Sequence, residues 1–447
     1  MNPIYDFPCK GDPNIYINIA KEMLNGSVLY RDVFDHKGPF IFFVYLIPNL
    51  LKNANMGLFL IDVVMFNVIA YFNIKTIKLT NNHITACLLV SVEIVLLLCS
   101  YITVSPELIS LAIISYANYW ILSGRYKQPQ AFELIFAGML VGVLFWIKYT
   151  LTIYLAVVFL YFIIKNTQWK NVYLPIIGFT IPTIIVFLYF SYNHAVRDLI
   201  YCYFIINLGY QSTDLFVFTP ALTILLATII GIGIMAIVKK KSEFLILALA
   251  HLALTITVFF MTGYVWTNLF TPFISVVSLL SIFDFNKYKK TVISLLVFIS
   301  LLLGYMLYTS SIGNIAAAKA YNHLNDFADN INETGGTIMV FQTEPVLPWE
   351  IEEIGYKYFF APTLTYEQLP EMYEKIFEDI SNQNIDYVVV LLNENGEIMP
   401  LSHFRTATEG ELVTLEWVKK IASEIYENYE VFGKYYQFTV FKAKEAM

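Results

Sequence analysis

Residues 132–165 read FELIFAGMLVGVLFWIKYTLTIYLAVVFLYFIIK, and few charges interrupt this long series of apolar side chains. A helix needs roughly 20 apolar residues to cross the hydrocarbon core of a bilayer, which is about 30 Å thick. The stretch is long enough for two crossings, 132–149 and 150–165, that meet at an external turn beside Lys148. It predicts a pair of membrane-spanning helices.

Similar apolar stretches occur on both sides of this pair. They lie near 57–74, 84–101, 107–123, 172–190, 217–238, 244–261, 264–283 and 291–309. Hydrophobic residues make up 57% of the 447 residues and charged residues 14%, against about 45–50% and about 25% in globular proteins. The expected fold is a polytopic α-helical membrane protein with about ten transmembrane helices.

Charge divides the chain into two parts. Residues 1–310 hold 19 Lys and Arg and 13 Asp and Glu, whereas residues 311–447 hold 9 and 22. Neither part has a dense basic face that would neutralise phosphates, which excludes a nucleic-acid binder. The four cysteines, Cys9, Cys87, Cys99 and Cys202, show no CxxC spacing. Neither a disulfide framework nor a zinc site is therefore indicated.

The loops between the spans alternate in charge, and this alternation predicts the orientation of the chain. The basic loops hold Lys75, Lys78, Arg125, Lys127, Lys165, Lys170, Lys239, Lys240, Lys241, Lys287, Lys289 and Lys290. The opposite loops hold chiefly Lys148 and Arg197. Because basic loops face the cytoplasm, both chain ends are expected on the external side of a cell membrane.

The N-terminal region does not fit this orientation by itself. Residues 1–37 contain neither a signal peptide nor a span that would carry them across the membrane. The apolar stretch 38–51 is short and is interrupted by Pro48, so we interpret it as an interfacial or re-entrant helix. We therefore expect that a preceding transmembrane helix is missing from the chain as given.

Three regions are expected on these grounds: an external juxtamembrane loop with interfacial helices at 1–56, a transmembrane domain at 57–310 and an external α/β domain at 311–447. The third region predicts strands at 337–342, 385–392 and 435–442 and helices near 365–381 and 411–429. It contains no GxGxxG motif, no P-loop and no His/Cys cluster. No independent catalytic centre is predicted there.

The first external loop holds most of the candidate site residues. Residues 12–26, DPNIYINIAKEMLNG, predict a helix with Asp12 as N-cap, Pro13 in the first turn and Gly26 after its end. The stripe of Ile15, Ile19 and Met23 favours a position in the membrane interface. The following loop, GSVLYRDVFDHKGPF, gathers charges directly before the apolar stretch; they are Arg31, Asp32, Asp35, His36 and Lys37. Such a cluster at a membrane surface indicates a site.

This loop resembles that of the GT-C glycosyltransferases, of the type that includes the dolichyl-phosphate-mannose protein mannosyltransferases and the lipid A aminoarabinose transferases of glycosyltransferase family 39. Members of that family have an acidic residue opening a juxtamembrane helix, a Tyr four residues later, a Gly ending the helix and a Lys-Pro or Lys-Gly-Pro before an apolar stretch. The corresponding residues are Asp12, Tyr16, Gly26 and Lys37-Gly38-Pro39. The sequence of residues 30–39, YRDVFDHKGP, also looks like that of a bacterial branch of the family.

The resemblance implies transfer of a sugar from a polyprenyl-phosphate donor, with inversion at the anomeric carbon. Asp12 would be the catalytic base and Lys37 would bind the donor phosphate. The substrate pocket would include Tyr16, Tyr30, Arg31, Asp35 and His36. The structural alternatives to these roles are a helix N-cap for Asp12 and, for Lys37, a lysine that extends to the membrane surface.

Three further residues in external turns are candidates for the site. Glu107 follows Pro106 at the mouth of a span and is the expected second carboxylate, with helix capping as the alternative. Lys148 breaks the charge pattern of the loops, which suggests an anion nearby; the alternative is an interfacial anchor. Arg197 is the third candidate for contact with the donor phosphate, and a local pair with Asp198 or a lipid headgroup is the alternative.

The expected partners are the membrane, the polyprenyl-phosphate donor and an external acceptor that is a wall polymer, a lipid-linked glycan or a protein. No cofactor is specified, and the need for a divalent metal is left open. One rival is a transporter or flippase of lipid-linked sugars, which would show paired hydropathy halves that are not visible here. Another is a catalytically inactive assembly subunit, which a missing first helix would explain.

Overall fold

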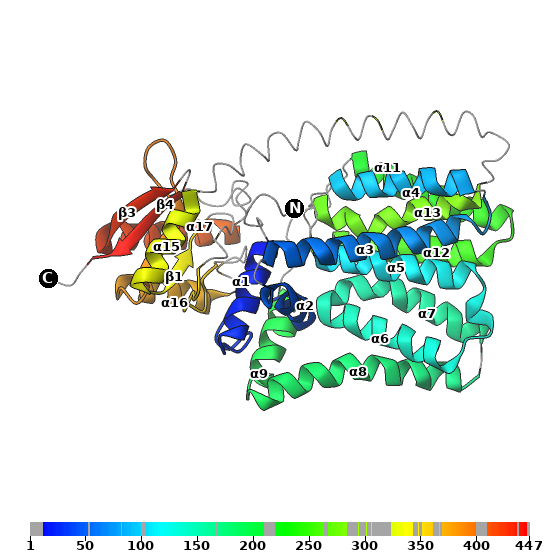
Figure 1. Cartoon of the computed structure of the whole chain (residues 1–447), viewed down its shortest axis with the longest axis horizontal. Helices are drawn as coiled ribbons and strands as arrows, with labels where there is room; N and C mark the ends of the chain where they lie inside the picture. Colours follow the sequence, from blue (N-terminus) through cyan, green and yellow to red (C-terminus); the bar gives the residue numbers. More distant parts are fainter. Residues whose placement is uncertain are drawn as a thin grey trace. The chain divides into compact units, whose positions relative to one another are not determined.

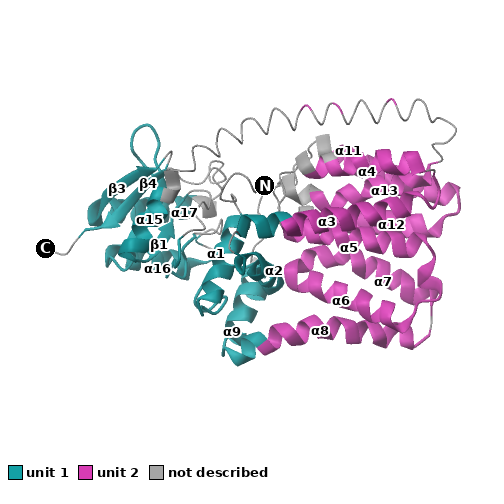
Figure 2. Cartoon of the chain, viewed as in Figure 1, with its two compact units in different colours: residues 1–59, 189–213, 314–447 teal, residues 60–188, 214–313 magenta. Residues whose placement is uncertain are grey.

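The computed structural model describes most of the chain from Asp12 to Lys444. The described residues are 12–51, 54–81, 83–99, 104–166, 168–209, 220–262, 267–283, 294, 301, 305, 323–342, 347, 351–360, 366, 369–398, 409–435 and 438–444. The expected span 291–309, the basic residues 287–290 and Cys9 lie outside the described residues, apart from the single positions 294, 301 and 305. Two compact units are formed, and each is described by itself (Figure 2).

One unit, residues 60–188 and 214–313, is helical (Figure 1). Its helices are α3 (Ala54–Ile77), α4 (His83–Cys99), α5 (Pro106–Leu122), η1 (Arg125–Lys127), α6 (Ala131–Lys148), η2 (Tyr149–Thr152), α7 (Ile153–Lys165), α8 (Lys170–Tyr192), α11 (Pro220–Val238), α12 (Ser242–Thr262), η4 (Thr267–Ser275), α13 (Val276–Leu279) and η5 (Leu280–Ile282). Three stretches are long and apolar enough to cross a membrane: Ala54–Ile77, Ala131–Lys165 and Lys170–Tyr192. Shorter apolar helices accompany them. The expected spans up to residue 283 thus coincide with helical segments.

The predicted pair at 132–165 forms a hairpin. Lys148 has an extended backbone, with φ −161° and ψ 98°, which separates α6 from the short segment η2. At the opposite end, the Asn166 side chain after α7 donates to the Tyr126 carbonyl before α6, at 3.1 Å. The two helices are therefore antiparallel neighbours, with Lys148 at the turn between them.

The expected span at 264–283 departs from a regular α-helix. Residues Thr267–Ser275 form a 3₁₀ helix that contains Pro272. Proline lacks the backbone N–H that an α-helix uses, and 3₁₀ segments of this length are uncommon. The buried Ser275 hydroxyl instead donates to the Pro272 carbonyl at 2.8 Å, and His251 Nε2 lies 2.8 Å from the same hydroxyl. The Ser275 hydroxyl thus connects this 3₁₀ segment to His251 of α12.

The other unit combines three distant parts of the chain, residues 1–59, 189–213 and 314–447 (Figure 2). Its first part contains α1 (Asp12–Leu24) and α2 (Pro39–Asn49), which pack against each other. Gly26 has φ +104°, a conformation that suits glycine, and so ends α1 where the sequence predicts. Gly38 and Pro39 start α2. The second part is a continuous helical segment made of α9 (Val196–Leu199), the π-helical η3 (Ile200–Ile205) and α10 (Ile206–Gly209).

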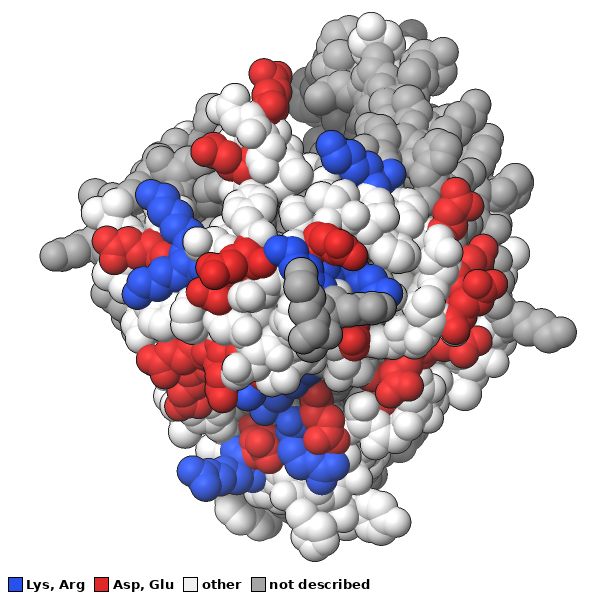
Figure 3. Space-filling view, turned by 90° about the vertical axis from the view of Figure 1, so that its left-hand side faces the viewer, with Lys and Arg blue, Asp and Glu red and all other residues white. Residues whose placement is uncertain are grey.

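The third part contains a four-stranded sheet of order β1-β2-β4-β3. Its elements are α15 (His323–Thr334), β1 (Ile338–Val340), α16 (Pro370–Ser381), β2 (Tyr387–Leu391), α17 (Glu409–Asn428), β3 (Tyr429–Tyr435) and β4 (Phe438–Ala443). Strands β1 and β2 are parallel, whereas β4 pairs antiparallel with both β2 and β3. One face of the molecule shows Asp and Glu side chains in several groups with Lys and Arg between them (Figure 3).

The structure contains two elements that the sequence does not predict, α15 and β3. Helix α15 was not expected, although Phe327, Ala328 and Ile331 give it a helical apolar stripe. Strand β3 lies where the sequence favours the end of a helix and a loop. It is an edge strand with few buried residues, so it lacks the alternating apolar pattern by which strands are recognised.

Candidate functional site

The loop between α1 and α2 is held in place by the last turn of α8 and by the helical segment that follows it. The Leu29 N–H donates to the Tyr189 hydroxyl at 3.3 Å, and the Asn207 amide donates to the His36 carbonyl at 2.6 Å. The Tyr30 ring stacks on Phe190 with 5.4 Å between centroids and 8° between planes. The position of residues 29–37 is therefore set by side chains more than 150 residues away in the sequence.

The Asp35 carboxylate organises the end of this loop. Its Oδ1 accepts hydrogen bonds from the backbone N–H groups of His36 and Lys37, the latter at 2.8 Å. The Lys37 ammonium lies 3.0 Å from His36 Nε2, and since an ammonium only donates, this ring nitrogen accepts. Burial raises the pKa of Asp35 above its ordinary value, while the charge of Lys37 opposes the shift.

Asp12 is an exposed residue at the start of α1. Its Oδ2 accepts a hydrogen bond of 3.1 Å from the hydroxyl of Tyr16, one helical turn later. Tyr16 is buried, and its ring meets Phe42 and Tyr45 of α2 edge-on at 5.5 Å and 5.4 Å. The aromatic packing of α1 against α2 therefore fixes a hydroxyl donor beside an exposed carboxylate.

The charges of Asp12 and Lys37 both act on the pKa of the buried Asp35 carboxyl. The pKa of the buried Asp35 carboxyl is raised first by burial and also by the negative charge of Asp12, and it is lowered by the ammonium of Lys37. Both charges thus lie within interaction range of the same buried group. An exposed carboxylate can accept a proton and an ammonium can hold a phosphate, so this arrangement can serve both ends of a group transfer.

Two residues expected in the substrate pocket are engaged in the loop itself. The Tyr30 hydroxyl donates to the Lys37 carbonyl, and its backbone has φ +69°, which is uncommon for a tyrosine. Arg31 binds Asp32 through two hydrogen bonds of 2.9 and 2.8 Å and donates to the Asn193 carbonyl at 2.9 Å. These contacts fix the conformation of the loop between α1 and α2.

Arg197 lies on α9 in the same unit and is exposed. The ion pairs of the described residues include no pair of Arg197 with Asp198. The local alternative to a ligand contact is thus not seen in the described part of the chain. Asp198 instead acts electrostatically on Arg31, whose pKa is raised mainly by its hydrogen bond with Asp32.

Glu107 and Lys148 lie in the other unit and bind each other. Glu107 follows Pro106 in the first turn of α5 and is 3% exposed. Its Oε1 lies 2.8 Å from the Lys148 ammonium at the turn of the α6–α7 hairpin. Ser105, and not Glu107, caps α5, because its hydroxyl accepts from the Leu108 N–H at 3.1 Å. The anion that the unusual position of Lys148 suggested is thus supplied by the chain itself.

A segment of the C-terminal part holds α1 from a second side. The Asn14 amide exchanges two hydrogen bonds with the backbone of Leu347, at 2.9 and 3.0 Å. The buried Glu22 carboxylate accepts from the Ile354 N–H at 2.8 Å. Every residue from Asn14 to Ala20 is buried, which goes beyond what one apolar stripe in a membrane interface predicts. The sequence analysis does not predict the roles of Asn14, Glu22 and Asn207. Polar residues inside apolar stretches, such as Asn207 in FIINLG, are a signal that could have indicated them.

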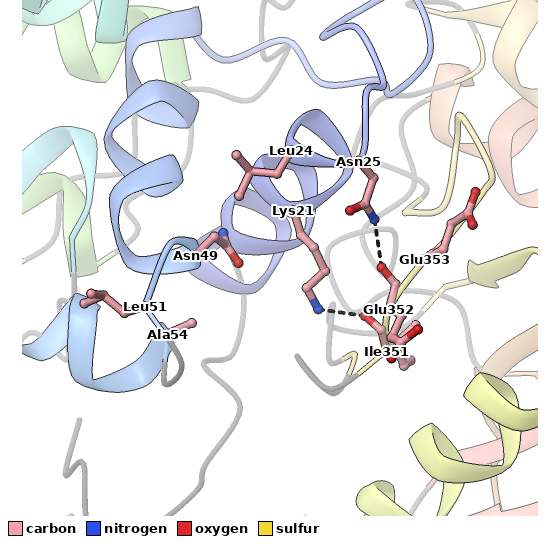
Figure 4. A pocket seen from close by; sticks show the side chains of 9 residues that line it. All are labelled: Lys21, Leu24, Asn25, Asn49, Leu51, Ala54, Ile351, Glu352 and Glu353. Atoms are coloured by element: carbon pink, nitrogen blue, oxygen red, sulfur yellow. Dashed lines mark hydrogen bonds between the residues drawn. The ribbon is translucent and has the colours of Figure 1, made fainter.

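A cavity of about 680 Å³ lies at the other end of α1. Figure 4 shows Lys21 and Asn25 pointing from α1 toward the 351–353 segment, where they donate to the carbonyls of Ile351 and Glu352 at 2.7 and 2.9 Å. Lys21 is nine residues after Asp12, which places it on the opposite side of the helix. This cavity and the Asp12 carboxylate are therefore separate features of the unit.

Among the described residues, no group of three or more His, Cys, Asp or Glu side chains is arranged to hold a metal ion. No family model matches the chain, and no curated protein matches it.

Proposed function

We propose that this protein is an integral-membrane glycosyltransferase that moves a sugar from a polyprenyl-phosphate donor to an external acceptor. The proposal is supported chiefly by Asp35 and Lys37 directly before the apolar helix α2, where the buried Asp35 carboxylate accepts from the Lys37 N–H and its pKa responds to the charges of both Lys37 and Asp12. A reaction between a lipid-borne donor and a water-borne acceptor needs a carboxylate and a cation where lipid meets water. The resemblance of the first external loop to GT-C glycosyltransferases gives these residues their roles.

In the proposed reaction, the acceptor hydroxyl attacks the anomeric carbon while Asp12 takes its proton. The bond between the anomeric carbon and the phosphate oxygen breaks, and its electron pair leaves with the polyprenyl phosphate. Lys37, with Arg197 as a further cation of the same unit, stabilises the phosphate charge. The Tyr16 hydroxyl keeps the Asp12 carboxylate oriented. We assign no step to the Glu107–Lys148 ion pair of the other unit.

The substitution Asp12→Asn tests the base. Asparagine caps a helix about as well as aspartate and still accepts from Tyr16, but it does not take a proton. Sugar transfer from a labelled polyprenyl-phosphate donor, in membranes that contain the full-length gene product, should fall by roughly 10²–10⁴ at equal abundance. Glu352→Gln is the matched control, because it removes an exposed carboxylate of the same unit near the far end of α1.

A second arm of the experiment addresses the donor phosphate. Lys37→Ala keeps the backbone contacts of residue 37 with Asp35 and Tyr30, so folding should be preserved. Donor binding should weaken while membrane abundance stays at the wild-type level.

Turnover of the Asp12→Asn variant within a few-fold of wild type would refute the assignment of Asp12 as the catalytic base. Wild-type membranes that flip the donor without consuming it would favour a transporter, and membranes that do neither would favour an inactive subunit.

A further inference from the structure

The helical unit contains a polar cavity of about 320 Å³ where three helix ends meet. Its lining comes from η1 after α5, from the end of α7 and from the start of α12. Lys127 and Lys165 of the lining belong to two of the basic loops of the sequence, and none of the proposed site residues lines the cavity. A function for it is therefore independent of the proposed sugar transfer.

Hydroxyl groups line this cavity in a connected row. The Tyr126 hydroxyl donates to Glu243 Oε1 at 3.0 Å and lies 3.4 Å from the Tyr161 hydroxyl. Tyr161 in turn lies 3.2 Å from the Ser242 hydroxyl. Such hydroxyls can donate to the oxygens of a bound anion by rotating the O–H bond.

Two lysines supply the positive charge. Lys127 Nζ is 3.8 Å from Glu243, a loose pair in which the lysine side chain is 64% exposed. Lys165 is exposed and enters none of the ion pairs of the described residues. Each ammonium lies 5.8 Å from the ring centre of a neighbouring tyrosine, Tyr126 or Tyr161. The cavity therefore presents two cations against one carboxylate, beside a row of hydroxyl donors.

An exposed apolar strip leads away from these cations along α7. Leu160 and Ile164 immediately precede the lining residues Tyr161 and Lys165, and their side chains are 60% and 66% exposed. Trp169, shortly after the helix, is 76% exposed. Exposed tryptophans of this kind mark the level of lipid headgroups, and the aliphatic strip offers a surface to an acyl chain.

We propose that this cavity binds the phosphate of an anionic phospholipid from the leaflet on the side of the basic loops. Lys127 and Lys165 hold the phosphate, the Tyr161 hydroxyl donates to one of its oxygens, and an acyl chain lies along Leu160 and Ile164, while the Ser242 hydroxyl keeps its hydrogen bond to Glu243. Basic pockets between membrane helices on this side recognise lipid headgroups through the same chemistry.

The test uses the full-length protein in detergent, titrated with dioleoylphosphatidylglycerol while the thermal unfolding midpoint is recorded. The midpoint should rise with this lipid and not with dioleoylphosphatidylcholine. The double variant Lys127→Gln, Lys165→Gln should bind about 30-fold more weakly, which corresponds to about 1 kcal/mol for each lysine. Lys75→Gln, Lys78→Gln is the matched control, because it removes the same charge from another basic loop, and Lys75 has a similar tyrosine contact.

Two further measurements separate the site from general charge attraction. Glu243→Gln removes the carboxylate of the cavity and should tighten lipid binding, and this variant also serves if the double variant folds poorly. Equal weakening in the Lys75, Lys78 control, or unchanged binding in both cavity variants, would overturn the proposal. Stabilisation by inorganic phosphate to the same extent as by the lipid would show a site for free phosphate and would overturn the lipid assignment.

Discussion

Asp35 is the residue on which the conformation of the candidate site depends. Its carboxyl group is buried, yet it accepts two backbone N–H bonds that place His36 and Lys37. Burial disfavours the charged form, and this effect exceeds the opposing effects of Lys37 and of the hydrogen bonds. The site therefore contains a carboxyl group whose protonation is linked to stability.

This linkage predicts a pH dependence of folding. Because burial raises the folded pKa of Asp35 above its ordinary value of 3.8, the folded protein holds a proton that the unfolded chain releases. The contribution of Asp35 to the free energy of unfolding is thus fully present below pH 3.8. It is lost as the pH rises through the folded pKa, and the free energy of unfolding then falls by up to about 1.4 kcal/mol per pH unit.

Asp35→Asn should flatten this part of the profile, since an amide oxygen still accepts both N–H bonds but does not titrate. Thermal unfolding midpoints of both proteins between pH 4 and 7 are the measurement. Burial also raises the pKa of Glu22, so Glu22→Gln is measured in parallel. Superimposable profiles of wild type and Asp35→Asn would contradict the linkage.

At the scale of elements, glycines decide how closely α6 and α8 pack. A Cβ atom on Gly138 would lie 2.0 Å from the Pro175 carbonyl oxygen, and one on Gly178 would lie 2.0 Å from that of Ile135. A Cβ atom on Gly142, four residues after Gly138, would lie 2.5 Å from the Pro182 ring and 2.9 Å from the Phe179 carbonyl oxygen. The helices touch through their backbones, as small residues spaced by four allow in membrane proteins.

Gly178→Ala should therefore force α6 and α8 apart. We expect the free energy of unfolding to fall by about 1–3 kcal/mol, as in an overpacked core, because the added Cβ atom meets backbone atoms and not a movable side chain. Gly231→Ala in α11 is the control, since a Cβ atom there meets nothing within 4 Å and alanine favours a helix. The thermal unfolding midpoint in detergent compares the two. Equal effects of both substitutions would disprove the close backbone contact.

At the scale of the whole molecule, the unit that carries the candidate site is assembled from three distant parts of the chain. Asn14 binds Leu347, and Arg31 binds the carbonyl of Asn193. Contacts of such long range depend on how the intervening helices fold, because closing such long loops costs entropy that short-range contacts do not. In the proposed membrane protein, the orientation of those helices decides on which side of the membrane the site forms.

The loop charges predict that orientation, and Lys240 tests it. This residue is exposed between α11 and α12, in one of the basic loops, and is expected to face the cytoplasm. A Lys240→Cys variant should resist a membrane-impermeant maleimide in intact cells and react after permeabilisation. A cysteine at the exposed Glu394 of the C-terminal domain should react in intact cells, and the native cysteines set the background. Ready labelling at position 240 in intact cells would reverse the arrangement.

Sequence alone predicts the helices of the apolar stretches up to residue 283, the bounds of α1 and α2, and the strands β1, β2 and β4. These follow from local signals: long apolar runs, a Gly at positive φ, a Gly-Pro start and alternating apolar residues. Edge strand β3 lacked such a signal, because its stability comes from pairing with β4. The sequence also predicts the group of charged residues in the loop between α1 and α2, which are all close in sequence.

The contacts of the charged residues, in contrast, are visible only in the folded chain. The pairing of Glu107 with Lys148, the support of residues 29–37 by the 189–209 segment and the hold of residues 347–354 on α1 join positions from about 40 to more than 300 residues apart. Contacts at such separations depend on the folding of all the chain between them, and periodicity and spacing report only on near neighbours. Burial of Asp35, and with it the shift of its pKa, follows from these long-range contacts and not from the sequence around it.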